Sequence, residues 1–345
     1  MRLISFQHAG TASVGALIDG ADPWPFNAGD GDSGIVNARI CDFNAPALRR
    51  IIDDAIDHAF DDKIDDARGP TGPDRLTMID LVRSPRAALV RIGQALAALD
   101  PAAMDPGAVL ALAAVELLAP LPRPGKIVAI GRNYADHALE TGVAPFEQPR
   151  IIFKLTTSVV GPGAVVRRPP GVVKLDFEVE LAVVIGRTAC RTPRATALDH
   201  VAGYTILDDV SAREFQFDVA PAQTSFAKSM DGFAPMGPCL VTADEIPDPQ
   251  QLRLATRVNG QPMQDATTAD MLFPVGRLIE YISGFITLEP GDVIATGTPA
   301  GIGAFRKPPV WLQPGDHIDM RIQGIGRLEH RIGDEAGRLK PSATA

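Results

Sequence analysis

Acidic residues interrupt two apolar stretches of this chain, at places where strands would begin or end. The stretch DFEVELAVVIG (176–186) predicts a β-strand, yet it carries Glu178 and Glu180. Side chains two residues apart on a strand point to the same face, so the two carboxylates would lie side by side. Taken alone, this strand also fits the edge of a sheet with its glutamates in water, because charged residues are mostly exposed.

A second apolar stretch changes that interpretation. VAGYTILDDV (201–210) also predicts a strand, and it ends in Asp208 and Asp209. Carboxylates at the ends of neighbouring strands can converge on one point, where they repel one another unless a cation lies between them. Three carboxylates without a nearby histidine or cysteine suit a hard cation, namely Mg²⁺, Mn²⁺ or Ca²⁺.

Hydrogen-bond donors follow Asp209 directly. The segment SARE (211–214) has the spacing of a capping box, which predicts that Ser211 begins a helix. Arg213 and Gln216 are three residues apart and would share a face of that helix, where they could donate to an anionic ligand on the metal. For Arg213 the alternative is a surface salt bridge, worth less than about 1 kcal/mol.

A histidine and a glutamate lie upstream, in GRNYADHALE (131–140). His137 and Glu140 are three residues apart, so on one helical turn the carboxylate could orient the imidazole. Such a pair is a competent general base. The spacing alone is weak evidence because it often occurs by chance, and the acidic residues downstream give it weight.

The composition limits the classes of protein. The chain has 345 residues, 46% hydrophobic and 22% charged, which is enough for a sizeable core in one or two domains. A formal net charge of −9 argues against nucleic acid as a partner. Three scattered cysteines make no disulfide framework, and no apolar run approaches the roughly 18 residues of a membrane span. We therefore expect a soluble, cytoplasmic protein without a membrane partner.

The first third of the chain mixes strands and helices. Residues 1–119 begin with short strand-like pieces, followed by two segments with helical spacing of apolar residues, 45–62 and 85–99. Two further segments, 28–34 and 61–74, have the polar character of loops. This part is expected to form a smaller α/β domain.

The remainder is richer in strands. A proline-rich segment, APLPRPG (119–125), is the expected domain boundary. Beyond it, strand-like runs alternate with Gly, Pro and Asp turns, and the best helix is 271–283. Many runs do not alternate between apolar and polar residues, which suggests strands buried on both faces. We expect an α+β fold rich in strands, with a second domain at 120–340.

Five segments together resemble a known family. In chain order they are KIVAIGRNYADHALE, DFEVELAVVIG, GYTILDDVSARE, AKSMDGFAPMGP and LEPGDVIATGTPAGIG. They make the chain from about 126 to 335 resemble the fumarylacetoacetate hydrolase superfamily. The resemblance implies a catalytic domain built on a mixed β-sheet roll, a variable N-terminal domain before it, a homodimer, and a site for Mg²⁺ or Mn²⁺.

The resemblance also implies roles for residues of the matching motifs. Glu178, Glu180 and Asp209 would be the metal ligands. His137 and Glu140 would activate a water molecule and would belong to a mobile lid.

Further roles concern the substrate, which the resemblance implies to be a small 2-oxo acid or diketo acid. Lys228 would stabilise a developing oxyanion together with Arg213 and Gln216. Thr298 would hold a substrate carboxylate, and Arg132 is counted with the substrate-binding residues.

One departure from the family pattern narrows the choice among the branches of the family. Members that cleave fumarylacetoacetate carry a fourth acidic ligand seven residues before the histidine, where this chain has Ile130. The chain is therefore more similar to the acylpyruvase and 2-hydroxyhepta-2,4-diene-1,7-dioate isomerase-like members. We expect a Mg²⁺- or Mn²⁺-dependent hydrolase that cleaves a C–C bond in an acylpyruvate-type substrate through a metal-bound enolate.

Two alternatives stay open. The same enolate would serve an isomerase, tautomerase or decarboxylase of a 2-hydroxymuconate- or oxaloacetate-type diacid in aromatic catabolism. The pair His137 and Glu140 favours hydrolysis, because isomerisation needs no activated water. The more distant alternative is a non-catalytic binding protein stabilised by a metal, against which the complete set of His137, Glu140 and Lys228 argues.

Overall fold

The computed structural model describes residues 1–18, 25–26, 38–57, 75–105, 107–140, 142 and 144–336. Within these residues the chain is an α+β protein rich in strands, as the sequence predicts. The predicted loops 28–34 and 61–74 lie outside the described residues, as does the end of the predicted helix 45–62.

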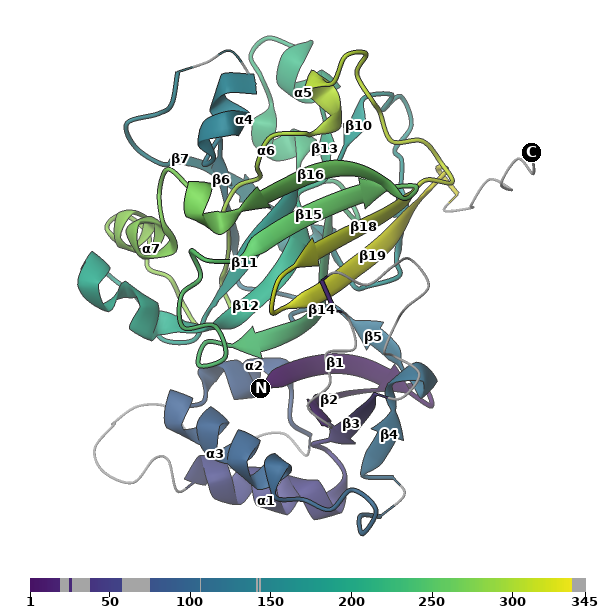
Figure 1. The fold of residues 1–345 in the computed structure, drawn as a ribbon, viewed down its shortest axis with the longest axis vertical. Helices are drawn as coiled ribbons and strands as arrows, with labels where there is room; N and C mark the ends of the chain where they lie inside the picture. The colour runs from purple at the N-terminus through teal and green to yellow at the C-terminus, as the bar shows by residue number, and fades with distance from the viewer. Residues whose placement is uncertain are drawn as a thin grey trace.

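Twelve strands of the described chain form one mixed sheet through the middle of the molecule (Figure 1). They are β1 (Arg2–His8), β2 (Thr11–Ile18), β3 (Arg39–Asp42), β4 (Val109–Ala111), β5 (Glu116–Leu118), β6 (Ile127–Gly131), β7 (Arg150–Lys154), β8 (Val159–Val160), β11 (Val179–Ile185), β12 (Val201–Asp208), β14 (Ala234–Thr242) and β17 (Val293–Ala295). The order along the sheet is β4-β3-β2-β1-β14-β12-β11-β17-β6-β7, with β5 beside β1 and β8 beside β14.

A second sheet covers one face of the first, in front of β11, β12 and β14 in Figure 1. Its order is β16-β15-β18-β19-β9, and its strands are β9 (Val165–Arg167), β15 (Arg253–Val258), β16 (Gln261–Thr267), β18 (His317–Ile322) and β19 (Gly326–Gly333). A short pair, β10 (Leu175–Asp176) and β13 (Ser211–Ala212), lies apart from both sheets. Val183 and Ile206 of the first sheet share a core with Leu254 and Met320 of the second.

Helices cover the remaining surfaces. The α-helices are α1 (Pro46–Asp57), α2 (Met78–Arg83), α3 (Arg86–Ala97), α4 (Ala135–Glu140), α5 (Glu214–Phe217), α6 (Thr224–Ala227) and α7 (Val275–Ser283), and the 3₁₀ turns are η2 (Leu112–Ala114), η3 (Thr156–Ser158), η4 (Arg194–His200), η5 (Thr268–Asp270) and η6 (Gly303–Phe305). The helices predicted at 45–62 and 85–99 are confirmed as α1 and α3. Helix α7 begins later than the predicted 271–283, because Pro274 is tolerated before a helix but not inside one.

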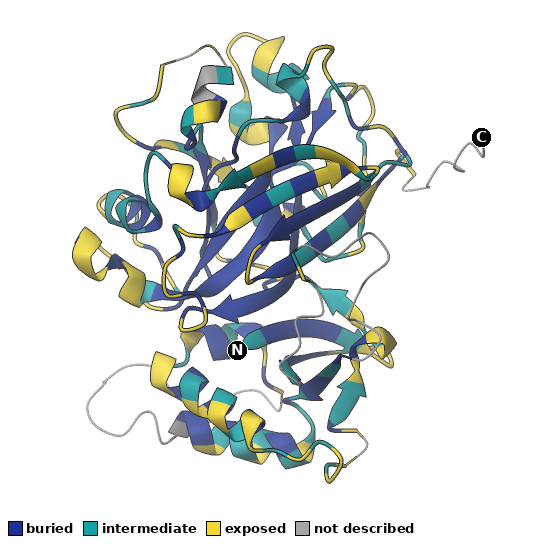
Figure 2. Ribbon diagram, viewed as in Figure 1, coloured by how far each residue is buried: buried dark blue, intermediate teal, exposed yellow. Residues whose placement is uncertain are grey.

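Strand β11 is buried on both faces, and Figure 2 shows the surrounding sheet in the colour of buried residues. Val179, Leu181 and Val183 belong to the core between the two sheets, whereas Ala182 and Val184 face the core that includes α1 and α3. This explains the uninterrupted apolar run in the sequence. A charged side chain at either end of such a strand is therefore also taken out of water.

The first sheet continues across the predicted boundary at 119/120. Strand β1 pairs with β14, where Leu3 lies opposite Leu240. The division into domains 1–119 and 120–340 stays a prediction, and α1 to α3 all belong to its first part. Among the described residues, none of the helices has both the length and the apolar character needed to cross a bilayer.

Candidate active site

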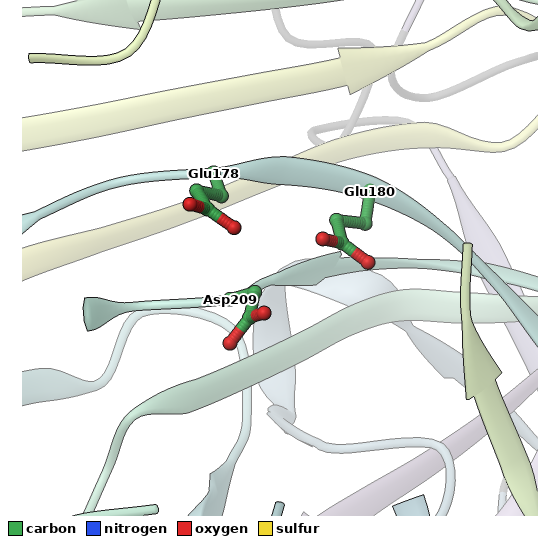
Figure 3. Close-up of side chains that lie close together, drawn as sticks. All are labelled: Glu178, Glu180 and Asp209. Carbon is green, nitrogen blue, oxygen red and sulfur yellow. The ribbon is translucent and has the colours of Figure 1, made fainter. Parts of the chain in front are cut away.

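Three carboxylates converge where β11 begins and β12 ends. Glu178, Glu180 and Asp209 are buried, and each offers an oxygen within 4.8 Å of the others; Figure 3 shows Glu178 and Glu180 on one segment and Asp209 on the next. The antiparallel register that sets Val179 opposite Asp208 produces this arrangement. The backbone amide of Asp209 also donates to the carbonyl oxygen of Glu178 at 2.9 Å. These three side chains are called the triad below.

The ammonium group of Lys228 lies against the triad. Its Nζ donates to Glu178 Oε2 at 2.8 Å, to Asp209 Oδ2 at 2.7 Å and to Ser211 Oγ at 2.8 Å. All three protons are therefore used by protein acceptors. To stabilise a substrate oxyanion, Lys228 would have to exchange one of these bonds for the substrate.

Arg213 holds the other side of Glu178. Its Nη2 donates to Glu178 Oε1 at 2.6 Å and its Nε to Asp176 Oδ2 at 2.9 Å. The third arm of the guanidinium, Nη1, reaches Gln216 Oε1 at 2.8 Å. The structure thus brings Arg213 and Gln216 together beside the triad, and Arg213 is buried rather than part of a surface salt bridge.

The predicted helix start at Ser211 is wrong. Ser211 lies in β13, opposite Asp176 of β10, and the helix begins at Glu214. The Ser211 hydroxyl cannot cap a helix because it donates to the carbonyl oxygen of Asp209 and accepts from Lys228. The Glu214 carboxylate turns away as well and accepts from the amide of Lys174 at 2.7 Å.

The sequence analysis missed Lys154, which is fully buried beside the triad. Its Nζ donates to Asp209 Oδ1 at 2.6 Å and to the carbonyl oxygen of Lys228. Asp176 was missed too, although its carboxylate accepts from Arg213 and from the amides of Gly303 and Ala304. A lysine directly after the apolar residues 151–153 of β7 was the signal that could have revealed Lys154.

The charges around the triad do not balance without a further cation. Among the described residues, this buried cluster holds five acids (Asp176, Glu178, Glu180, Asp208 and Asp209) and three bases (Lys154, Arg213 and Lys228). His330 Nε2 lies 2.7 Å from Asp208 Oδ2, and even with this partner the acids outnumber the basic side chains. Buried charges are costly unless paired, so the donor set fits a divalent cation. Asp209, Glu178 and Glu180 are the residues that could hold it.

The pKa values of the two glutamates of the triad are shifted in opposite directions by their surroundings. Burial alone would raise the pKa of Glu178, but the positive charges of Lys228 and Arg213 outweigh it and lower this pKa to about 2. Burial raises the pKa of Glu180 well above its usual value, and the negative charges of Asp209 and Glu178 raise it further. A divalent cation between the carboxylates would favour the ionised form of Glu180.

The glycine-containing loop that follows β17 holds the carboxylate of Glu180 by a hydrogen bond. The amide of Gly297 donates to Glu180 Oε2 at 2.8 Å. Gly297 has φ +97°, and a Cβ there would lie 2.7 Å from the Cβ of Asn133, so both its conformation and its space demand glycine. The next residue, Thr298, donates its hydroxyl to the Val179 carbonyl and accepts from Gln264. Its expected donation to a substrate carboxylate would require breaking the bond to Val179.

The predicted pair His137 and Glu140 lies on α4, close to the same glycine loop. His137 is buried, and its Nδ1 lies 3.3 Å from Glu140 Oε2. Glu140 accepts in addition from the amide of Gly301 at 3.2 Å. The rings of His137 and Phe305 pack in a T-shaped arrangement, with 6.2 Å between their centroids. These contacts orient the imidazole and hold α4 against the loop that supports Glu180.

Two other positions considered from the sequence provide no ligand or hydrogen bond to the triad. Ile130 is buried in the apolar core on β6 and offers no fourth ligand. Arg132 places its guanidinium over the ring of Phe146 at 5.5 Å, and within the described residues none of the hydrogen bonds joins it to the triad. A role for Arg132 therefore has to be argued from its own surroundings.

The sequence is similar to a known protein family and to characterised relatives. The family model described as fumarylacetoacetate (FAA) hydrolase, C-terminal, matches residues 126–333. A mitochondrial oxaloacetate tautomerase of Bos taurus is 41% identical over 256 residues, 74% of this chain and 79% of the relative.

Two solved structures are also similar to this chain. The 2-hydroxyhepta-2,4-diene-1,7-dioate isomerase of Mycobacterium marinum is 30% identical with a TM-score of 0.66, covering 97% of this chain and 99% of the other. The fumarylacetoacetate hydrolase of Exiguobacterium antarcticum is 32% identical with a TM-score of 0.71 and the same coverage.

Proposed function

We propose that this chain, which belongs to the fumarylacetoacetate hydrolase family, is a divalent-cation-dependent tautomerase that interconverts the keto and enol forms of an oxaloacetate-type 2-oxo diacid. The observation that carries the proposal is the buried triad beside the His137–Glu140 pair. The relatives contribute the substrate class, since one is named an oxaloacetate tautomerase and another an isomerase of an unsaturated diacid. They favour this alternative over the C–C hydrolase that the sequence led us to expect.

The cation would be held by Glu178, Glu180 and Asp209. Oxygen ligands suit Mg²⁺ or Mn²⁺, and Ca²⁺ could occupy the same ligands. Such an ion supplies Lewis-acid chemistry, which stabilises negative charge on the oxygens of a 2-oxo acid.

The proton at C3 of the substrate is the one that must move. His137 is the proposed base, because Glu140 lies within reach of its Nδ1 and orients the imidazole. It takes the proton from C3, a double bond forms between C2 and C3, and the electron pair of the former carbonyl moves to the C2 oxygen. That oxygen then takes a proton from solvent and His137 releases its own proton to solvent, so atoms and charge balance and the imidazole is ready for another turnover. Arg213 and Lys228 would face the negative charge of the substrate.

The assay follows enol-oxaloacetate by its absorbance after dilution into buffer. We expect the purified chain with Mg²⁺ or Mn²⁺ to accelerate the loss of the enol, and chelation of the metal to abolish this acceleration. Failure to accelerate tautomerisation with any of the three cations would contradict the proposal.

Hydrolysis of a C–C bond is the second candidate. It is supported by the His137–Glu140 pair, which could aim a water molecule at a distal carbonyl, and by the similarity to a fumarylacetoacetate hydrolase. Release of a carboxylic acid from an acylpyruvate would identify this activity, and release of CO₂ from oxaloacetate would identify decarboxylation.

Some expectations stay predictions. They are the homodimer, the cytoplasmic location and a place in aromatic catabolism. The location in particular is open to test by fractionation, because the animal relative is named as mitochondrial.

A further inference from the structure

Two arginines bracket the segment that carries His137 and Glu140. Arg132 directly follows β6, and Arg150 begins β7, where it lies opposite Gly131 in the antiparallel pair. The connection between these strands contains α4, which stands at the end of β6 and β7 in Figure 1. Both arginines therefore lie at the base of the proposed lid.

A single aromatic ring of that connection contacts both guanidinium groups. The Cζ of Arg132 lies 5.5 Å from the ring centroid of Phe146, and the Cζ of Arg150 lies 5.8 Å from it. Within the described residues neither arginine is in an ion pair. Arg132 also adopts φ 56°, a conformation that is unfavourable for a residue with a side chain. The ring offers cation–π contacts to both guanidiniums, but it supplies no negative charge to neutralise them.

The electrostatics agree with this geometry. Burial lowers the pKa of Arg132, and the positive charge of Arg150 lowers it further. An anion between the two guanidiniums would turn this repulsion into two charge-assisted contacts.

Arg132 is linked to the triad through the neighbouring Asn133 and two hydrogen bonds. Asn133, next to Arg132, donates its side-chain amide to the carbonyl oxygen of Thr296 at 2.7 Å. The following amide, that of Gly297, donates to Glu180. Because β6 and β17 run parallel, their carboxyl ends meet at the same edge of the sheet. An anionic group at Arg132 is thus on the side of the sheet where the triad lies.

We propose that Arg132 and Arg150, held against Phe146, bind the second carboxylate of a dicarboxylic substrate. The inference rests on the proposed function, in which the 2-oxo acid end of the substrate occupies the triad and the other carboxylate still needs a partner. A guanidinium presents paired donors that match the two oxygens of a carboxylate. The subsite would therefore select diacids over monoacids, and its ligand would contact the base of the lid.

The test compares a diacid with a monoacid. Arg150→Gln and Arg132→Gln are assayed with oxaloacetate and with pyruvate, each as exchange of C3 hydrogen for solvent deuterium in the presence of Mg²⁺. Arg167→Gln, a change on β9 of the second sheet, is the matched control. We expect kcat/KM for oxaloacetate to fall about 10–100-fold in each variant, mainly through KM, because a hydrogen bond between charged groups is lost. Exchange into pyruvate should change less than twofold, and Arg→Lys at either position should restore part of the loss.

Two results would overturn the inference. Equal losses with both substrates would mean that the arginines only support the fold, and unchanged oxaloacetate kinetics would mean that they do not touch the substrate.

A binding experiment separates this inference from the proposed function. Malonate is titrated calorimetrically into the Mg²⁺-loaded wild type and into Arg150→Gln, with acetate and inorganic phosphate as comparison ligands. Tighter binding of malonate than of acetate, lost in the variant, supports the subsite even if the wild type proves not to be a tautomerase. Equal malonate binding by both proteins refutes the subsite whatever the activity, and preferential binding of phosphate would refute its assignment to a carboxylate.

Discussion

Removing the imidazole of His137 tests the proposed proton transfer most directly. The side chain is buried, and its Nδ1 is engaged by Glu140, so the ring is held in one orientation. A positioned general base contributes about 10²–10⁴ in rate, which corresponds to about 3–5 kcal/mol of barrier. We expect His137→Ala to lower tautomerisation of oxaloacetate within that range.

The partner of the imidazole should matter less. The Nδ1–Oε2 distance of 3.3 Å is long for a hydrogen bond, and Glu140 also accepts from Gly301. Glu140→Gln keeps an acceptor for both groups and removes only the charge. We therefore expect a loss of about fivefold, since a hydrogen bond to a charged group exceeds a neutral one by about 1 kcal/mol.

The assay uses two readouts on one substrate: decay of the enol absorbance, and entry of solvent deuterium at C3. His200→Ala, a change of a histidine on η4, controls for general effects of losing an imidazole. Binding of Mn²⁺ should be unchanged in His137→Ala, because His137 is not in the triad. A His137→Ala enzyme within twofold of the wild type in both readouts would refute the assignment of the base.

Five further outcomes are expected. Glu180→Gln keeps an acceptor for Gly297 but removes one carboxylate of the triad, so Mg²⁺ or Mn²⁺ should no longer raise its melting temperature as it does for the wild type. Cation affinity, measured by calorimetry, should fall as the pH is lowered from 7.5, because Glu180 has a raised pKa and its proton competes with the metal. In the metal-free protein, Glu178 should contribute stability that is fully present above its usual pKa of 4.5 and is lost as the pH falls towards about 2; if urea titrations of the wild type and of Glu178→Gln show no difference in slope over this range, this pKa is not depressed. His330→Phe should destabilise the protein to urea by about 3 kcal/mol, because it leaves the buried Asp208 carboxylate without its 2.7 Å partner. In an unliganded crystal, residues 135–150 should have the highest B-factors around the site and lower ones with a bound 2-oxo acid, and equal B-factors in both crystals would argue against a lid.

Local patterns in the sequence were sufficient for the strand-rich fold and for most of the site. The apolar run of β11, the two-residue spacing of its glutamates and the aspartates that end β12 depend only on the alternation of side chains along a strand. The helical spacing of His137 and Glu140 is local in the same sense. Each of these features could be read from residues that are near one another in the chain.

Tertiary structure decided which of these groups meet and what surrounds them. Lys154, Asp176 and His330 reach the cluster from separate elements, and no local pattern predicts those contacts. Ser211 shows the converse, since its capping-box spacing was overridden by pairing with Asp176 and by the bond from Lys228. Strand register is chosen by burial of whole faces rather than by neighbouring residues. The register between β11 and β12 is therefore what turns three separate acidic residues into one site for a cation.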